Sequence, residues 1–129
     1  MKAGCLVLVV EDDEDIREVL ATILDESGYR VIIAKNGEEA LQRLRSGTCR
    51  PCVILLDLWM PVMDGRQFRK EQLKDASLAD IPVVAFSGDG ETQGLDAAAY
   101  LSKPVQLNPL ISTIERFCQV CETEPEGER

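Results

Sequence analysis

Side chains that can do chemistry follow four apolar stretches of the sequence. Glu11 and Asp12 follow the first stretch, Asp57 the second, Ser87 the third and Lys103 the fourth. These stretches are the candidate strands Cys5–Val10, Val53–Leu56, Pro82–Phe86 and Tyr100–Ser102. The carboxyl ends of parallel strands share one edge of a sheet, and ligands bind there. The pattern therefore predicts that three carboxylates, a hydroxyl and an ammonium group meet at one edge.

Three crowded carboxylates favour a bound cation, because without one they repel each other. Mg²⁺ (or Mn²⁺) suits such an all-oxygen site and keeps water ligands that a phosphate oxygen can replace. Lys103 would add a second positive charge for an anionic oxygen. An aspartate can attack phosphorus where a metal and a lysine stabilise the charge on the transferred group. Asp57 is best placed for this, since it stands alone at its strand end.

The elements that must position these groups alternate along the chain. A further strand-like stretch, Val31–Ala34, and several helical patterns lie between the others. The helical patterns carry apolar residues, which in the first of them are spaced three or four apart. The positions are Ile16, Val19, Leu20, Ile23 and Leu24, then Ala40, Leu41 and Leu44, then Phe68 and Leu73, and finally Leu110, Ile111, Ile114, Phe117, Cys118 and Cys121. Apolar strands separated by helices predict an α/β, doubly wound parallel sheet with helices on both faces.

Composition excludes several classes of protein. With 129 residues, 45% of them hydrophobic, the chain fits one domain, which we expect over residues 1–121 with a polar tail over 122–129. A net charge of −9 gives the surface as a whole no attraction for nucleic acid or an anionic membrane. The sequence has neither a signal-peptide layout nor a bilayer-spanning run, which predicts a cytoplasmic protein. It has no histidine, so any phosphohistidine must belong to a partner.

In these motifs the chain resembles the receiver domain of two-component response regulators, the group that includes the chemotaxis response regulator. The resemblance runs from Leu6 to the last helix and rests on ordered matches at four strand ends. The matching segments are Leu8–Asp12, Asp57–Pro61 with Met63–Gly65, Ser87–Gly88 and Tyr100–Pro104. It implies a flavodoxin-like, five-stranded sheet in the order 2-1-3-4-5. We expect a stand-alone receiver, because nothing in the sequence suggests an attached output module.

The resemblance also implies roles for individual residues. Asp57 would accept the phosphoryl group. Asp12 and Asp57 would bind Mg²⁺ directly, whereas Glu11 would act largely through water. The backbone carbonyl of Trp59 would complete the protein ligands, and Lys103 would contact a phosphoryl oxygen.

Phosphorylation would then act as a switch rather than as a turnover reaction. Ser87 would move to bond the phosphoryl group, Tyr100 would change rotamer in the vacated space, and the Lys103–Pro104 bond would be cis. The donor would be a phosphohistidine on a sensor histidine kinase or a histidine phosphotransfer protein. An unidentified downstream protein would read the change. No catalysis is expected beyond the chain's own phosphotransfer and slow autodephosphorylation.

Three other functions fit parts of the pattern. A metal-dependent phosphatase with an aspartyl nucleophile needs a second acid two residues later, where this chain has Trp59. A flavodoxin-like flavin binder needs a phosphate-binding loop after the first strand, and Glu11–Asp13 would repel a phosphate there. The stronger alternative is a receiver-fold module that binds partners without phosphorylation. The presence of every site residue argues against it.

One segment departs from the family pattern. Gly88–Ser102, between Ser87 and Lys103, is shorter than the same segment of most receivers. The missing length belongs to the fourth helix, for which Gly94–Ala99 supplies one or two turns. The fourth helix, fifth strand and fifth helix form the face through which many receivers dimerise or bind partners. We therefore expect a monomer or a weak dimer.

The five cysteines allow two interpretations. We expect reduced thiols, as in most cytoplasmic proteins. The pairs Cys49/Cys52 and Cys118/Cys121 have the internal spacing of zinc ligands, and the fold would place all five sulfurs at the pole opposite the carboxylates. Yet Cys118 and Cys121 also continue an apolar stripe, and a buried cysteine packs like a small hydrophobic residue. The sequence leaves open whether these pairs bind metal.

Overall fold

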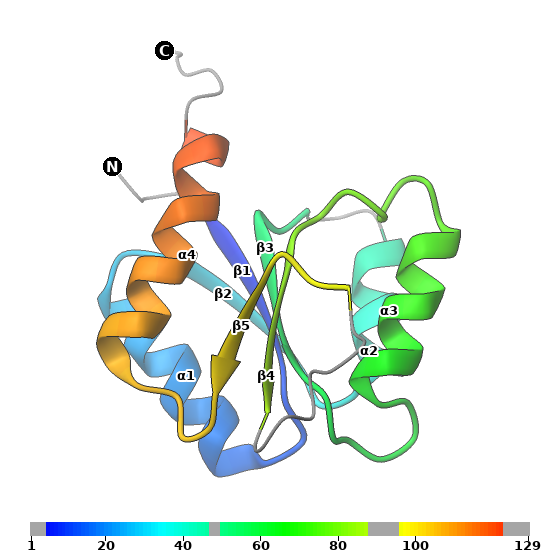
Figure 1. The fold of residues 1–129 in the computed structure, drawn as a ribbon, viewed down its shortest axis with the longest axis horizontal. Helices are drawn as coiled ribbons and strands as arrows, with labels where there is room; N and C mark the ends of the chain where they lie inside the picture. Colours follow the sequence, from blue (N-terminus) through cyan, green and yellow to red (C-terminus); the bar gives the residue numbers. More distant parts are fainter. Residues whose placement is uncertain (1–4, 47–49, 88–95, 123–129) are drawn as a thin grey trace.

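The computed structural model describes residues 5–46, 50–87 and 96–122, with only the backbone described for 119–122. Strands and helices alternate from β1 to β4, and the described part of the chain then continues with β5 and α4 (Figure 1). The strands are β1 (Leu6–Val10), β2 (Arg30–Ala34), β3 (Val53–Asp57), β4 (Val83–Ser87) and β5 (Ala99–Ser102). The helices are α1 (Glu14–Glu26), α2 (Gly37–Arg45), α3 (Gly65–Lys74) and α4 (Leu107–Glu122). None of these helices has the length and hydropathy needed to cross a membrane.

All five strands are parallel and lie in the order β2-β1-β3-β4-β5, which confirms the predicted doubly wound sheet. The three central strands are buried along their whole length. Val10 pairs with Leu56 in the neighbouring strand, and Ser87 pairs with Ser102. This register brings the carboxyl ends of β1, β3, β4 and β5 to the same edge of the sheet.

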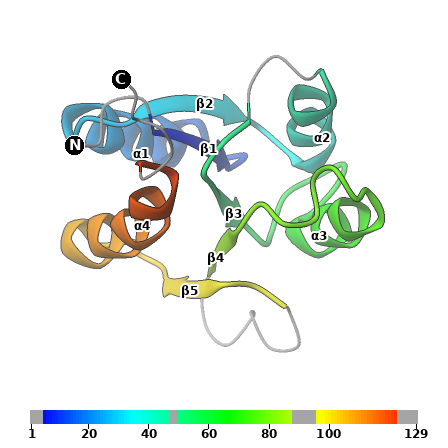
Figure 2. The same cartoon turned by 90° about the horizontal axis from the view of Figure 1, so that it is seen from above.

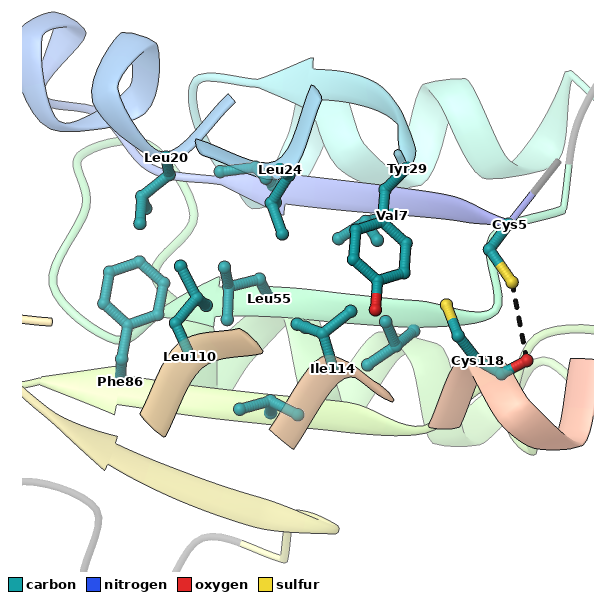
Figure 3. Close-up of a cluster of buried hydrophobic side chains, with 13 residues drawn as sticks. Cys5, Val7, Leu20, Leu24, Tyr29, Leu55, Phe86, Leu110, Ile114 and Cys118 are labelled. Atoms are coloured by element: carbon teal, nitrogen blue, oxygen red, sulfur yellow. Dashed lines mark hydrogen bonds between the residues drawn. The ribbon is translucent and has the colours of Figure 1, made fainter. Parts of the chain in front are cut away.

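The strands bury side chains on both faces, because successive residues point in opposite directions. Leu24 of α1 and Ile114 of α4 pack against one face, in the core drawn in Figure 3. Leu41 of α2 and Phe68 of α3 pack against the other. Figure 2 shows α1 and α4 on one side of the sheet and α2 and α3 on the opposite side. The site edge therefore lies between two helical layers.

Two residues of the predicted apolar stripes face solvent instead of the core. Val19 is 56% exposed and Leu73 is 47% exposed, so the prediction is wrong at both positions. Gln72 is buried in α3, where its amide donates to the carbonyls of Leu78 at 2.9 Å and Ile81 at 3.1 Å. Those carbonyls belong to the segment leading into β4 and need a donor when buried. Helical spacing cannot reveal this need, because it depends on tertiary packing.

The segment between β4 and β5 differs from its prediction. Residues 88–95 lie outside the described ranges. In the described part of the expected helix Gly94–Ala99, residues 96–98 are not helical and Ala99 already belongs to β5. The Ala98 N–H donates to the carbonyl of Val83 at 2.8 Å. Pairing with β4 thus begins at Ala98 and continues into β5, so Ala99 is strand rather than helix, which overrides the marginal stability of so short a helix.

Candidate functional site

Asp57, the last residue of β3, lies buried at the carboxyl-terminal edge of the sheet. Its side chain is 1% exposed, and a buried charge needs a partner. Lys103, which follows β5, places its Nζ 3.0 Å from Asp57 Oδ1 and 3.6 Å from Glu11 Oε1. The ammonium reaches these carboxylates past the Phe86 ring, whose centre lies 5.4 Å away. One cation therefore faces carboxylates from two different strands.

Glu11 and Asp12 leave the end of β1 with different exposure. Glu11 is buried, whereas the Asp12 side chain is exposed. The Glu11 N–H donates to the carbonyl of Ala34 at 3.1 Å, and Glu11 Oε2 accepts from the Asp13 N–H at 3.0 Å. Carboxylate oxygens of Glu11, Asp12 and Asp57 lie within 4.8 Å of one another. The structure thus brings together the three carboxylates and the ammonium that the sequence placed at one edge.

The crowding changes the acidity of two groups. Burial raises the pKa of Glu11 to about 7, and the nearby Asp57 adds to the rise, while the Asp13 N–H and Lys103 oppose it. Burial acts to lower the pKa of Lys103, but the carboxylates of Asp57 and Glu11 outweigh it, so that this pKa is raised. At neutral pH the Glu11 carboxyl is therefore only partly ionised, whereas Lys103 remains an ammonium.

Two buried oxygens of this cluster fit a further cation. Within the described residues, Asp57 Oδ2 and Glu11 Oε1 accept no hydrogen bond. An unsatisfied buried acceptor costs about 1–3 kcal/mol, which a bound cation would offset. The donor set consists of carboxylate oxygens, and the exposed Asp12 leaves one side open to water. This combination fits Mg²⁺ or Mn²⁺ better than a softer metal.

The loop after β3 packs closely around Asp57. The Trp59 N–H lies 3.4 Å from Asp57 Oδ1, and its indole is 61% exposed. At Gly65, the first residue of α3, a Cβ atom would lie only 2.7 Å from the Asp57 carbonyl oxygen. Val62 has a φ of 70°, which a β-branched residue rarely adopts. Sequence reasoning missed both Gly65 and Val62, since the Asp-Gly pair signals a turn but not a close contact.

The remaining predicted residues lie near the same edge. Ser87 is buried at the end of β4, and its carbonyl accepts from the Lys103 N–H at 3.0 Å. Tyr100 is 49% exposed, and its hydroxyl accepts from the Ala97 N–H at 3.3 Å. The peptide bond between Lys103 and Pro104 is cis, as predicted. The roles of Ser87 and Tyr100 in a switch stay predictions.

Comparison with known proteins identifies the family. The model of the response regulator receiver domain matches residues 7–115. The chain belongs to this family. The receiver is 36% identical over 118 residues to the polar-differentiation response regulator DivK of Brucella anthropi, covering 86% of this chain and 94% of DivK. It is 34% identical over 115 residues to the phosphate regulon transcriptional regulatory protein PhoB of Klebsiella pneumoniae, covering 84% of this chain. The receiver spans only 49% of PhoB.

Solved structures share the fold of this receiver. The receiver domain of a signal transduction histidine kinase from Syntrophus aciditrophicus has a TM-score of 0.84 and 27% identity, with 98% of each chain covered. The chemotaxis protein CheY4 of Vibrio cholerae has a TM-score of 0.80 and 30% identity, with 89% of this chain and 99% of CheY4 covered. These similarities are consistent with a part in two-component signalling.

Proposed function

We propose that this receiver accepts a phosphoryl group on Asp57 from a phosphohistidine, with Mg²⁺ bound beside it. The observation that carries the proposal is the buried Asp57 carboxylate, with Lys103 Nζ at 3.0 Å and oxygens of Glu11 and Asp12 within 4.8 Å. The chain has no histidine, so the donor is a separate protein or domain, either a sensor histidine kinase or a histidine phosphotransfer protein.

The chain's own residues account for the steps of the transfer. An oxygen of Asp57 bonds to phosphorus while the bond from phosphorus to the donor imidazole nitrogen breaks. Lys103 then exchanges its contact with Asp57 Oδ1 for one with a phosphoryl oxygen. Glu11, Asp12 and Asp57 would hold Mg²⁺, which supplies positive charge to the oxygens of the transferred group. We expect the donor to approach from the side of Asp12, because that side chain is exposed.

The phosphoryl group would change a protein-interaction surface through the end of β4 and β5. It adds roughly −1.5 to −2 charges and new acceptor oxygens beside Ser87. Ser87 would turn its hydroxyl toward these oxygens. Tyr100, now half-exposed with its hydroxyl on the Ala97 N–H, would then turn inward. An unidentified downstream protein would recognise the altered surface.

Intact-mass measurement tests the acceptor directly. The protein is incubated with Mg²⁺ and phosphoramidate, a small donor whose phosphorus–nitrogen bond resembles that of phosphohistidine. We expect the wild type to gain the mass of one phosphoryl group and Asp57→Asn to gain none. Asp15→Asn, which removes an exposed carboxylate from the start of α1, should behave like the wild type. A wild type that gains no mass would instead favour a module that works without phosphorylation.

The two tyrosines offer a separate test of the switch. Fluorotyrosine labelling gives one ¹⁹F resonance each for Tyr29 and Tyr100, the only tyrosines of the sequence. With Mg²⁺ and beryllofluoride, a phosphoryl mimic, we expect the Tyr100 resonance to shift. Tyr29, which is 2% exposed in the core, should stay in place and serves as the internal control. An unchanged Tyr100 resonance in protein that binds beryllofluoride would contradict the switch but not the phosphorylation.

A further inference from the structure

Three cysteines meet at the pole of the sheet opposite Asp57. Cys5 immediately precedes β1, Cys52 immediately precedes β3, and Cys118 lies near the end of α4. Their sulfur atoms all lie within 4.8 Å of one another. The sequence pointed to the Cys49/Cys52 and Cys118/Cys121 pairs, but Cys49 and the Cys121 side chain lie outside the described residues. The structure instead joins one member of each pair to Cys5.

Backbone pairing fixes the positions of these cysteines. The N–H of Cys52 donates to the carbonyl of Leu6 at 2.8 Å, next to Cys5 in the sequence. The Arg30 N–H donates to the carbonyl of Cys5, also at 2.8 Å. The sulfurs of Cys5 and Cys52 therefore project from neighbouring strands held in register. Sheet pairing therefore fixes two of the three cysteines, and the third lies on α4.

The surroundings of the cluster are apolar. Cys5 and Cys118 are each 1% exposed and belong to the core between the sheet and α1 and α4, while Cys52 is half-buried at its margin. Figure 3 shows Cys5 and Cys118 beyond Val7 and Ile114, at one end of this core. Cys5 Sγ donates to the backbone carbonyl of Cys118 at 3.4 Å. Of the three residues only Cys52 is partly exposed, so an ion would enter on its side.

The geometry points to a soft-metal site, and we propose that the sulfurs of Cys5, Cys52 and Cys118 bind Zn²⁺. Thiolate sulfur is a preferred zinc ligand, and Zn–S bonds of about 2.3 Å place tetrahedral ligands about 3.8 Å apart. The observed limit of 4.8 Å exceeds that value by about 1 Å. We expect water to supply the fourth ligand on the half-buried side at Cys52. The carbonyl end of α4 also favours a cation, because helix dipoles are negative there.

The oxidation state of Cys52 controls this site. Cys5 and Cys118 are thiols, but Cys52 forms a disulfide, so the expectation that every cysteine is reduced is wrong there. Composition indicates a compartment, whereas a disulfide also requires two sulfurs in bonding range. A dithiol reductant would break this bond, giving two thiols and the oxidised reductant. Zn²⁺ then binds as the three cysteine thiols each release one proton.

Cobalt substitution tests the site with a sulfur-specific readout. Co²⁺ is titrated into the reduced protein, in which thiolate coordination gives strong near-ultraviolet charge-transfer absorption. We expect the absorption to saturate at one equivalent of Co²⁺ and to disappear when Zn²⁺ displaces it. The unreduced protein and Cys52→Ser should both lack it. Cys52 is the residue to replace because it is half-buried and because the reduced wild type, with which the variant is compared, also lacks the disulfide; circular dichroism checks the fold of both.

Two controls separate this site from the other ligands of the chain. Asp57→Asn removes a carboxylate of the acidic cluster and should leave the charge-transfer absorption unchanged. The double variant Cys49→Ser/Cys121→Ser removes the cysteines outside the described side chains and should still bind one equivalent. Absorption that persists in Cys52→Ser, or is lost in the double variant, would overturn the assignment. So would the lack of any absorption in the reduced, folded wild type.

Discussion

The two ends of the sheet carry opposite kinds of metal-binding atoms. At the carboxyl-terminal edge, the Glu11 and Asp57 carboxylates share the Lys103 ammonium. At the other end, the sulfurs of Cys5 and Cys118 lie in an apolar core with Cys52 at its margin. Carboxylates are hard ligands, and burial keeps Glu11 only partly ionised at neutral pH before any metal ion binds. Thiols are soft ligands and stay neutral until a metal replaces their protons.

The difference shows how charge governs what a fold can bury. The acidic cluster needs a counter-ion whenever its carboxyl groups are ionised, since a buried, unpaired carboxylate is costly. It therefore depends on Lys103 from another strand and on the open side at Asp12. The cysteine cluster needs no counter-ion in its metal-free form, so it can be part of the core. Losing one partner should accordingly cost more at the acidic end.

Lys103→Gln should have the largest effect on stability, because it leaves the carboxylates of the acidic end without their counter-ion. Breaking a buried ion pair costs about 3–5 kcal/mol. Because the Lys103 side chain is 29% exposed, we expect a loss nearer about 2–3 kcal/mol in the free energy of unfolding. Urea unfolding of metal-free protein at neutral pH measures it. Lys74→Gln, which removes a surface pair with Glu71, should cost less than about 0.5 kcal/mol. Equal losses in the two variants would contradict the dependence on Lys103.

Gly65→Ala tests whether the packing of α3 serves only the acidic end. The added methyl group would meet the Asp57 carbonyl oxygen at 2.7 Å and Leu58 Cα at 2.8 Å. Overpacking against the backbone should cost about 2 kcal/mol and weaken Mg²⁺ binding, measured by Trp59 fluorescence. The cobalt absorption of the cysteine cluster should not change. An unchanged stability would show that the start of α3 can shift without harm.

The pH dependence of Mg²⁺ binding should follow Glu11. The pKa of Glu11 in the fold is about 7, above the ordinary 4.5. Protonation of Glu11 therefore stabilises the metal-free protein at low pH. This stabilisation disappears as the pH rises through about 7. Mg²⁺ requires the charged form. Its affinity should therefore rise up to tenfold per pH unit, about 1.4 kcal/mol, below about pH 7 and then level off.

Trp59 fluorescence titrations across this pH range measure the affinity. Glu11→Gln should flatten the dependence, because an amide does not titrate. Glu14→Gln, an exposed neighbour at the start of α1, should keep the dependence of the wild type. A Glu11→Gln variant with the wild-type slope would show that another group controls the binding.

Val62→Gly should have the smallest effect on the free energy of unfolding, and it should stabilise the protein rather than destabilise it. The side chain is 73% exposed, and its φ of 70° costs a β-branched residue about 1–2 kcal/mol. Glycine removes this strain, but its greater freedom in the unfolded state costs the fold about 0.5–1 kcal/mol. We expect a net stabilisation of up to about 1.5 kcal/mol in urea unfolding. A destabilised variant would mean that the Val62 side chain has contacts worth more than the strain.

Much of the fold follows from the sequence, because strand and helix periods are local properties. Each strand begins and ends within one residue of its predicted bounds. The placement of Glu11, Asp57 and Lys103 followed too, since parallel strands must end at one edge. Exposure at Val19 and Leu73 did not follow, because a helical period does not say how far the core extends around a helix.

Contacts between distant segments were harder to foresee. Cys-x-x-Cys spacing indicates metal ligands that are close in sequence. Sheet register and helix packing instead bring together Cys5, Cys52 and Cys118. The close contact at Gly65 likewise depends on where α3 begins relative to β3. Such information lies in tertiary packing rather than in any one segment.

Strand β1 sets the distance between the cysteine cluster and the acidic cluster. Cys5 and Glu11 stand at its opposite ends, and six residues of extended chain at about 3.3 Å each span about 20 Å. The strand is fully buried and paired with β2 on one side and β3 on the other, so this length is fixed by the fold. Paramagnetic ions placed at the two clusters would therefore report one narrow distance distribution rather than a broad range.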